Sequence, residues 1–320
     1  MLRAQPSRRS HAVLVIPLVV LLTALPVISA QQPIRVDVNL VLVEVTVRDH
    51  RGQVVGGLKP ENFQIFEDGV EQQVMHFSQD QLPLAVALVV DLSSSIEPFL
   101  RPLRYATLTA LKALKAEDAV ALFTFAERVT RRVALTRDKT AVSEQIELIT
   151  AGGGTNISGA VLEAAEYLKQ EAPSARRVIV LVSDNVHTTL AAPSLDHVVT
   201  AALEADASVY SLKVPGNNRG LGFAAATLAT RVNVNRLAEA TGGEVFDVEK
   251  TGSLYLAFER LIERLKTRYT LGYYPKNTAL DGGFRKIEVR LRNHDRGRLR
   301  VLAKRGYYAP VAAAVRPGRP

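Results

Sequence analysis

Several residue types and motifs are absent from the sequence. There is no cysteine, so the chain has no disulfide, no thiolate metal site and no cysteine nucleophile. The glycines Gly152–Gly154 are not followed by the lysine of a phosphate-binding loop, and no G-x-S-x-G motif exposes a serine. His50, His76, His197 and His294 are scattered without zinc-site spacing. The common thiol, zinc and P-loop chemistries therefore lack their residues.

Long apolar runs are also lacking after the first thirty residues, and the composition is that of a folded protein. Apolar residues make up 47% and charged residues 22% of the 320 residues, close to globular averages. This length accommodates one large α/β domain and a smaller module. Without disulfides, the core alone must stabilise the fold.

The first thirty residues have the layout of a secretory signal. Arg3, Arg8 and Arg9 precede the apolar run Ala12–Leu25, and a small residue, Ala30, ends the segment. An uncleaved anchor helix is the alternative, but this run is shorter than the ~20 residues that cross a bilayer. We expect cleavage after Ala30 and an exported protein, whether periplasmic, cell-surface or secreted.

The basic excess is modest and lies late in the chain. The formal charge of +8 includes three signal arginines, which leaves +5 (8 − 3). Cations between Arg285 and Arg305 alternate with apolar residues, as on the solvated face of strands. No aromatic platform or recognition helix accompanies them, so no nucleic-acid partner is expected.

Residues 34–78 are predicted to form a small antiparallel β module. The segment 34–47 alternates at period two, and 63–66 and 67–70 resemble a strand and a turn. Strands recur after Arg268, at 269–274, 284–291 and 299–304. Because isolated hairpins are marginal, we expect these late strands to join the N-terminal ones.

Between the two flanks, strands and helices alternate. The run Leu84–Val90 is almost continuously apolar, as in a parallel strand buried on both faces. The alternation predicts a doubly wound, mostly parallel α/β sheet, inserted in or flanked by the β module. The expected divisions are the signal peptide 1–30, the N-terminal β module 31–80, the α/β domain 81–267, the C-terminal strands 268–308, and a loose tail 309–320.

Polar residues at the ends of the predicted strands are the candidate site, because ligands of open parallel sheets bind beyond the carboxyl ends of the strands. Two carboxylates and three hydroxyls gather there, and such hard oxygen donors suit Mg²⁺. Asp91, Ser93 and Ser95 alternate along one segment, so their side chains can face one point. The glycine run allows Thr155 to come close to that point. The predicted ligands are Asp91, Ser93, Ser95, Thr155 and Asp184.

These residues resemble the von Willebrand factor type A family. Asp91-Leu-Ser-Ser-Ser95 matches its D-x-S-x-S signature, and Thr155 in a glycine-rich loop and Asp184 after a hydrophobic strand follow in the family's order. The resemblance implies a metal-ion-dependent adhesion site. Mg²⁺ is then the expected ion, with Mn²⁺ or Ca²⁺ as alternatives.

The flanks are similar to a bacterial group of exported proteins related to this family. The phrases Leu58–Phe63, Tyr269–Pro275 and Arg305–Tyr308 carry this likeness. One departure is Asn185, where the family often has glycine. We expect Asn156, Asn185 and His187 to form a partner-binding rim, although a helix-start role for Asn156 is favoured, and Ser94 to face away.

Three functions stay open at this point. The first is metal-dependent protein binding, in which a partner's Asp or Glu completes the metal shell, on its own or within an envelope assembly. The second is a structural or assembly factor with a vestigial metal site. The third is a hydrolase using Ser93 or Ser95 with His187, although roles rather than residue types define such a triad. The long segment 217–230 is a lid or an insertion.

Overall fold

The computed structural model describes residues 40–79, 82–189, 192–216, 230–251, 253–266, 269–292 and 299–311. By its contacts Val38–Pro320 is one compact unit, distinct from Met1–Asp37. The expected signal segment, the segment 217–229 and the tail after Val311 lie outside the described residues. Among the described residues, no helix combines the length and the apolar character needed to cross a membrane.

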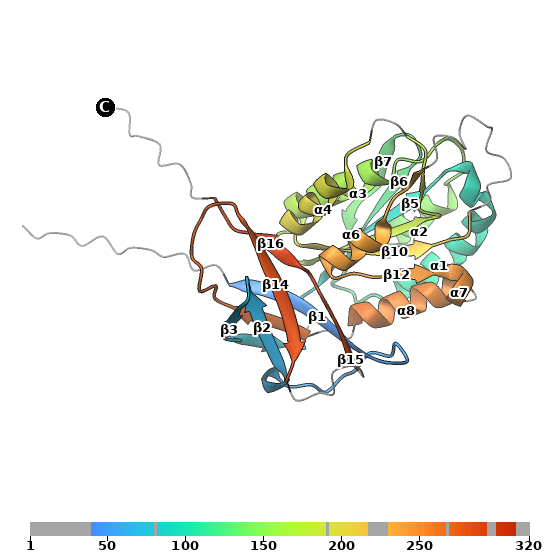
Figure 1. Cartoon of the computed structure of the whole chain (residues 1–320). Helices are drawn as coiled ribbons and strands as arrows, with labels where there is room; N and C mark the ends of the chain where they lie inside the picture. Colours follow the sequence, from blue (N-terminus) through green and yellow to red (C-terminus); the bar gives the residue numbers. More distant parts are fainter. Residues whose placement is uncertain are drawn as a thin grey trace, which may run out of the picture. The chain divides into compact units, whose positions relative to one another are not determined.

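A six-stranded sheet forms the centre of the α/β domain (Figure 1). Its order is β12-β10-β8-β5-β6-β7, and every neighbouring pair is parallel except β6 with β7. All residues of β5 are buried, which explains its continuous apolar run. The strands are β5 (Leu84–Asp91), β6 (Ala119–Phe125), β7 (Val129–Thr136), β8 (Arg176–Ser183), β10 (Ala207–Lys213) and β12 (Val245–Asp247).

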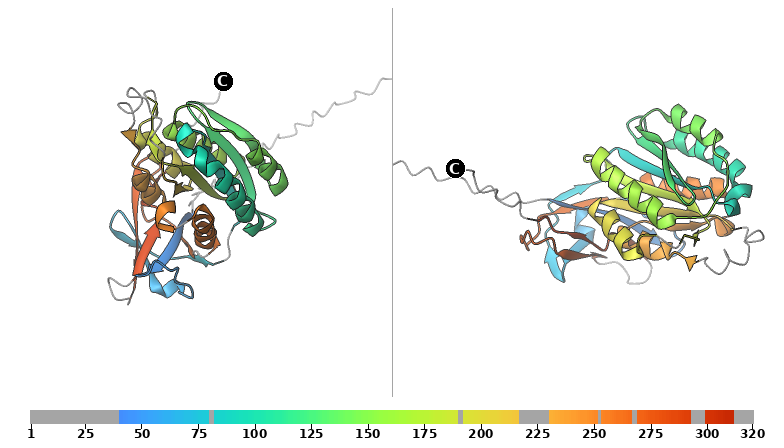
Figure 2. Two further views of the ribbon diagram at one scale, coloured as in Figure 1. Left: turned by 90° about the vertical axis from the view of Figure 1, so that its right-hand side faces the viewer. Right: turned by 90° about the horizontal axis from the view of Figure 1, so that it is seen from above.

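Helices cover both faces of this sheet, as the views in Figures 1 and 2 show. Alternate residues of β5 enter two separate cores, with Leu88 in one and Ala87 in the other. The Leu88 face packs against η2 (Ser94–Phe99), α1 (Leu100–Ala113), α2 (Lys139–Glu147), α7 (Val248–Thr251) and α8 (Leu254–Lys266). The Ala87 face packs against α3 (Ile157–Glu171), α4 (Leu195–Glu204) and α6 (Val234–Thr241).

The prediction of a doubly wound, mostly parallel α/β sheet with a separate antiparallel β module is confirmed. Some details differ from the sequence expectations. The apolar spacing after Leu100 predicts a helix to Ala116, but α1 ends at Ala113. The two-residue pair of β9 (Val186–His187) with β11 (Thr230–Arg231) was not expected. Pairs this short leave no periodicity in a sequence.

The β module consists of two four-stranded antiparallel sheets with a shared apolar core. Both sheets combine N-terminal and C-terminal strands. They alternate in the order β15-β1-β13-β4, whereas in the order β16-β14-β2-β3 a C-terminal pair adjoins an N-terminal pair. The elements are β1 (Val41–Asp49), η1 (Pro60–Asn62), β2 (Phe63–Glu67), β3 (Val70–Gln72), β4 (His76–Ser78), β13 (Tyr269–Tyr273), β14 (Phe284–Leu291), β15 (Leu299–Ala303) and β16 (Gly306–Tyr308).

A buried carboxylate ties the two sheets of the β module together. Glu67 of β2 is 2% exposed, and its Oε2 accepts hydrogen bonds from the hydroxyls of Tyr273 (2.7 Å) and Tyr307 (2.9 Å). Burial, followed by the contact with Glu67, raises the pKa of Tyr273 above its usual value. Both phenols therefore stay protonated and serve as donors that offset the burial of the carboxylate.

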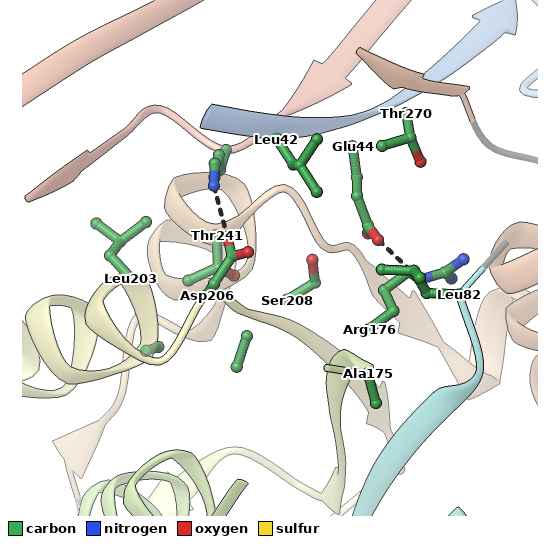
Figure 3. Close-up of a pocket in the computed structure, with 13 residues that line it drawn as sticks. Leu42, Glu44, Leu82, Ala175, Arg176, Leu203, Asp206, Ser208, Thr241 and Thr270 are labelled. Atoms are coloured by element: carbon green, nitrogen blue, oxygen red, sulfur yellow. Dashed lines mark hydrogen bonds and ion pairs between the residues drawn. The ribbon is translucent and has the colours of Figure 1, made fainter. Parts of the chain in front are cut away.

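Ion pairs join the β module to the α/β domain. Arg176 Nε, at the start of β8, lies 3.1 Å from Glu44 Oε1 of β1, and Lys304 Nζ lies 2.6 Å from Asp206 Oδ1. Figure 3 shows both pairs at the edges of a small cavity, with Leu42 on the module side. Because Arg176 begins β8, this junction lies at the amino ends of the parallel strands.

A second group of charges at the junction is centred on Glu244. Its carboxylate accepts hydrogen bonds from both terminal guanidinium nitrogens of Arg48, and it also accepts one from Arg264 Nε of α8 at 3.3 Å. Arg264 in turn donates to the carbonyl of Gly52 in the β module. The side chains of Glu244, Arg48 and Arg264 are 19%, 15% and 11% exposed, respectively. One carboxylate is therefore shared by two largely buried cations.

We expect Glu244→Gln to destabilise the chain by about 3 kcal/mol, because it leaves two buried guanidinium groups without a counter-charge. The midpoint of urea unfolding measures this effect. Glu239→Gln is the matched control, since its pair with Arg305 is 58% and 60% exposed, and exposed substitutions usually change stability by less than about 0.5 kcal/mol. Equal midpoints for the two variants would contradict this account of the junction.

Candidate metal site

The candidate site begins at Asp91, the last residue of β5. The side chain is fully buried, and each carboxylate oxygen has a donor: Oδ1 accepts from the Ser93 backbone N–H (2.7 Å) and Oδ2 from the Ser183 hydroxyl (2.6 Å). Ser183 ends β8, the strand beside β5. The carboxylate is therefore held at the carboxyl ends of two adjacent central strands.

The surroundings of Asp91 disfavour its negative charge. Burial raises its pKa to about 7, hydrogen bonds from Ser183 and Ser93 act in the opposite direction, and the negative charge of Asp184 raises it further. A cation beside the carboxylate would favour its ionised form and lower this pKa. Asp91 and Asp184 are thus close enough to interact electrostatically, and a divalent ion would relieve their repulsion.

The hydroxyls of Ser93 and Ser95 lie next to each other. Their Oγ atoms are 3.0 Å apart, in the turn where the chain leaves β5 and enters η2. Mg²⁺ binds oxygen at about 2.0–2.1 Å in an octahedron, so ligands at adjacent corners lie about 3 Å apart. Ser94 between them is exposed. The two hydroxyls therefore have the separation of neighbouring magnesium ligands.

The glycine loop brings Thr155 to the same end of the sheet. The Gly152 backbone N–H donates to the carbonyl of Leu92 (2.6 Å), directly after Asp91. Gly153 has a φ of +97°, which L side chains rarely adopt. Thr155 is 2% exposed, and among the described residues its hydroxyl takes part in no hydrogen bond, although Thr188 Oγ1 accepts from its backbone N–H (2.8 Å). That hydroxyl is free to bind a ligand.

Asp184 follows Ser183 at the end of β8 and is 6% exposed. Its Oδ1 accepts from the Val186 backbone N–H at 2.9 Å. A Cβ on Gly216 would lie 2.6 Å from its Oδ2, so a larger residue there would require the carboxylate to shift. Asp184 and Gly216 both line a polar cavity beside the sheet edge.

The three expected rim residues have different surroundings. Asn156 is the N-cap of α3, and its Oδ1 accepts from the Gly159 backbone N–H at 3.0 Å. Asn185 is 8% exposed, adopts a φ of +62°, and accepts from the Ser211 hydroxyl at 3.4 Å. The cap explains Asn156 structurally; a partner-binding role for any of the three stays a proposal.

His187 does not contact either serine. Its Nε2 lies 2.7 Å from the carbonyl oxygen of Thr189 and therefore donates to it. Its Nδ1 is buried without a hydrogen-bond partner among the described residues. Among the described residues, His187 forms no hydrogen bond with Ser93 or Ser95. The serine nucleophile and histidine base of a catalytic triad are therefore not joined here.

Direct hydrogen bonds thus join Asp91, Ser93 and Ser95, whereas loop contacts place Thr155 and electrostatics relate Asp184 to Asp91. Two supporting residues were not among the predicted ligands. The position of Ser183 beside Asp184, at the end of a predicted strand, could have indicated its role. Nothing in the sequence indicates a role for Thr188. Among the described residues, no three His, Cys, Asp or Glu side chains form a metal-binding group, so any metal here depends on hydroxyls.

The fold and this group of oxygens define a class: an α/β domain with a hydroxyl-rich site at the carboxyl edge of its sheet. Residues 86–187 match the family model of the von Willebrand factor type A domain. The chain therefore contains a von Willebrand factor type A domain in this region, as the D-x-S-x-S resemblance indicated. No curated protein matches the chain.

Solved structures with similarity to the chain are remote. An aerotolerance-related membrane protein from Bacteroides fragilis is 16% identical, with coverage of 56% of this chain and 98% of that one and a TM-score of 0.43. BatB from Bacteroides thetaiotaomicron is 17% identical, with coverage of 57% and 97% and a TM-score of 0.44. Proximal thread matrix protein 1 from the mussel byssus, with a zinc-occupied MIDAS motif, is 18% identical, with coverage of 62% and 49% and a TM-score of 0.45.

We expect Asn156→Ala to lower the free energy of unfolding by about 1 kcal/mol, the usual effect of losing an N-cap acceptor. Chemical denaturation followed by circular dichroism measures it. Asn156→Ser keeps an acceptor and should stay within a few tenths of a kcal/mol of the parent. If the alanine variant were as stable as the parent, Asn156 would not be acting as the cap of α3.

Proposed function

We propose that this chain is an exported, metal-dependent protein-binding module with a Mg²⁺ site at the carboxyl edge of its α/β sheet. The observation that carries the proposal is the buried Asp91 carboxylate with the hydroxyls of Ser93 and Ser95 beside it, 3.0 Å apart. Oxygen donors at this spacing fit an octahedral ion better than they fit catalysis. Thr155 and Asp184 complete the proposed ligand set.

The charge of the site favours an acidic partner. Three neutral hydroxyls do not neutralise a divalent ion, and carboxylates that bind it through water neutralise it less closely than direct ligands, so the ion still attracts an anion. An Asp or Glu of another protein is then the natural occupant of an exchangeable position. The same donors accept Mn²⁺ or Ca²⁺, because both are hard cations that bind oxygen. In this proposal the chain binds and does not catalyse.

The position of the β module supports access to the site. β8 begins at Arg176, which contacts Glu44 of the module, and ends at Ser183, which contacts Asp91. The module therefore contacts the edge of the sheet opposite the proposed metal. We propose module boundaries at 80/81 and 267/268, a cleaved signal in 1–30, and a periplasmic, cell-surface or secreted location. The module could then attach the protein to an envelope assembly.

One observation favours a second function, a structural or assembly role with a vestigial metal site. Both oxygens of Asp91 already have protein donors, so the carboxylate is satisfied without an ion. Cells carrying Asp91→Ala distinguish the two functions. A normal phenotype with a folded variant supports the structural role, and loss of function supports metal-dependent binding.

We expect Mg²⁺ and Mn²⁺ to bind the purified chain in calorimetry, and we expect Asp91→Asn and Ser93→Ala to weaken this binding roughly tenfold or more, since each removes a ligand. Ser94→Ala is the matched control, because Ser94 is exposed between the two ligand serines. Circular dichroism checks that all three variants are folded. Parent-like affinity in Asp91→Asn and Ser93→Ala would remove the assigned site.

A pull-down from envelope extract tests the acidic-partner hypothesis. We expect a protein to be retained in Mg²⁺ and released in EDTA, and not retained by Thr155→Ala, whose only loss is one hydroxyl and one methyl. Mutation of single Asp and Glu residues of that protein should then abolish retention at one position. Retention unchanged by EDTA would show that the interaction does not use the metal.

A further inference from the structure

The edge strand β7 carries an unusual set of charges. Residues 128–137 contain four arginines, Arg128, Arg131, Arg132 and Arg137, and no acidic residue. All four are exposed, and among the described residues none lies in an ion pair. Some other exposed cations have partners, as Arg290 has Glu288 and Arg292 has Glu71. This strand therefore presents unneutralised positive charge.

β7 is also the end of the sheet, paired with β6 alone. Thr130, Arg131 and Arg132 are exposed in its middle. An edge strand offers backbone N–H and C=O groups to another strand. Toward the other end, the Leu135 N–H is already bound by the Tyr167 hydroxyl (2.7 Å). The open part of the edge is therefore the stretch 129–133, in which the register with β6 shifts at Arg132.

The two central arginines lean to opposite faces of the sheet. Arg131 lies over the ring of Tyr167, 4.5 Å from its centroid, on the face covered by α3. Arg132 Nε donates to Thr124 Oγ1 (3.1 Å), and Thr124 faces the opposite side from Phe123, which packs on Tyr167. The edge thus has one guanidinium group on each face.

We propose that β7 binds an extended acidic segment of a partner protein by strand addition, with two consecutive acidic residues opposite Arg131 and Arg132. The contacts of Arg131 and Arg132 lie on opposite faces of the sheet. Consecutive residues of a regular partner strand also point to opposite faces, so an acidic pair meets one arginine on each face. Opposite charges on adjacent strands are stabilising, and like charges are not. Two copies of β7 would bring arginines together, which disfavours self-pairing.

This surface is separate from the proposed metal, although it starts at the same end of the sheet. The turn before β7 contacts the glycine loop, since the Asn156 N–H donates to the carbonyl of Ala126 (2.8 Å). Binding along β7 itself uses backbone groups and arginines and no metal ligand. It can therefore be measured with the metal removed.

The test uses two fluorescein-labelled nine-residue peptides of Thr and Val with a central Glu-Glu or Lys-Lys pair, in EDTA at low salt. We expect only the Glu-Glu peptide to raise the anisotropy, to slow hydrogen exchange at 129–133, and to lose affinity as salt increases. The double variant Arg131→Glu/Arg132→Glu should weaken the Glu-Glu peptide about tenfold or more and gain affinity for the Lys-Lys peptide.

The matched control is Arg290→Glu/Arg292→Glu, which makes the same change of charge on the β module and should leave peptide binding unchanged. Arg131→Lys/Arg132→Lys keeps the charge and should retain binding. No binding at millimolar peptide, binding without exchange protection in β7, or equal weakening by the control variant would overturn the proposal. Because EDTA is present throughout, these outcomes do not depend on whether the metal site exists.

Discussion

The hydrogen bond from Ser183 to Asp91 is the interaction on which the candidate site depends. It joins the ends of two central parallel strands and supplies one of two donors to a fully buried carboxylate. A carboxylate without donors would be too costly to bury there. The other donor, the Ser93 N–H, turns the chain sharply after β5, and this turn is what sets the hydroxyls of Ser93 and Ser95 side by side.

Apolar burial and polar contacts have separate roles in this chain. Three apolar cores stabilise the two faces of the α/β sheet and the β module, whereas ion pairs such as Glu44 with Arg176 and Arg48 with Glu244 join the module to the domain. Charged contacts fix an orientation more than they add stability. Their location at the amino ends of the strands leaves the opposite edge for binding.

The carboxyl edge and the β7 edge would recognise the same chemistry by different means. At the first, a divalent ion would supply the positive charge; at the second, Arg131 and Arg132 supply it directly. Both favour acidic groups on a partner, and the contact between Ala126 and Asn156 connects the loops that carry them. A single acidic partner could therefore span both surfaces.

Sequence alone predicted the fold well where the pattern was periodic. The nearly continuous apolar run Ala119–Phe125 predicts a strand, and β6 has those bounds, because a strand buried on both faces is mostly apolar. It could not give the antiparallel direction of β7 or the two-residue pair of β9 and β11, since neither changes the local pattern. The end of α1 was placed three residues late, because apolar spacing continues past the last helical hydrogen bond.

For the site, local spacing sufficed for Asp91, Ser93 and Ser95, because alternation along one short segment directs all three to one point. Local spacing could not predict the contacts that support these residues. Ser183 meets Asp91 across 92 positions of sequence and Thr188 meets Thr155 across 33, so only the folded sheet brings them together. The sequence determined which oxygens were available; the tertiary structure decided which were fixed by hydrogen bonds and which, like the Thr155 hydroxyl, were left free.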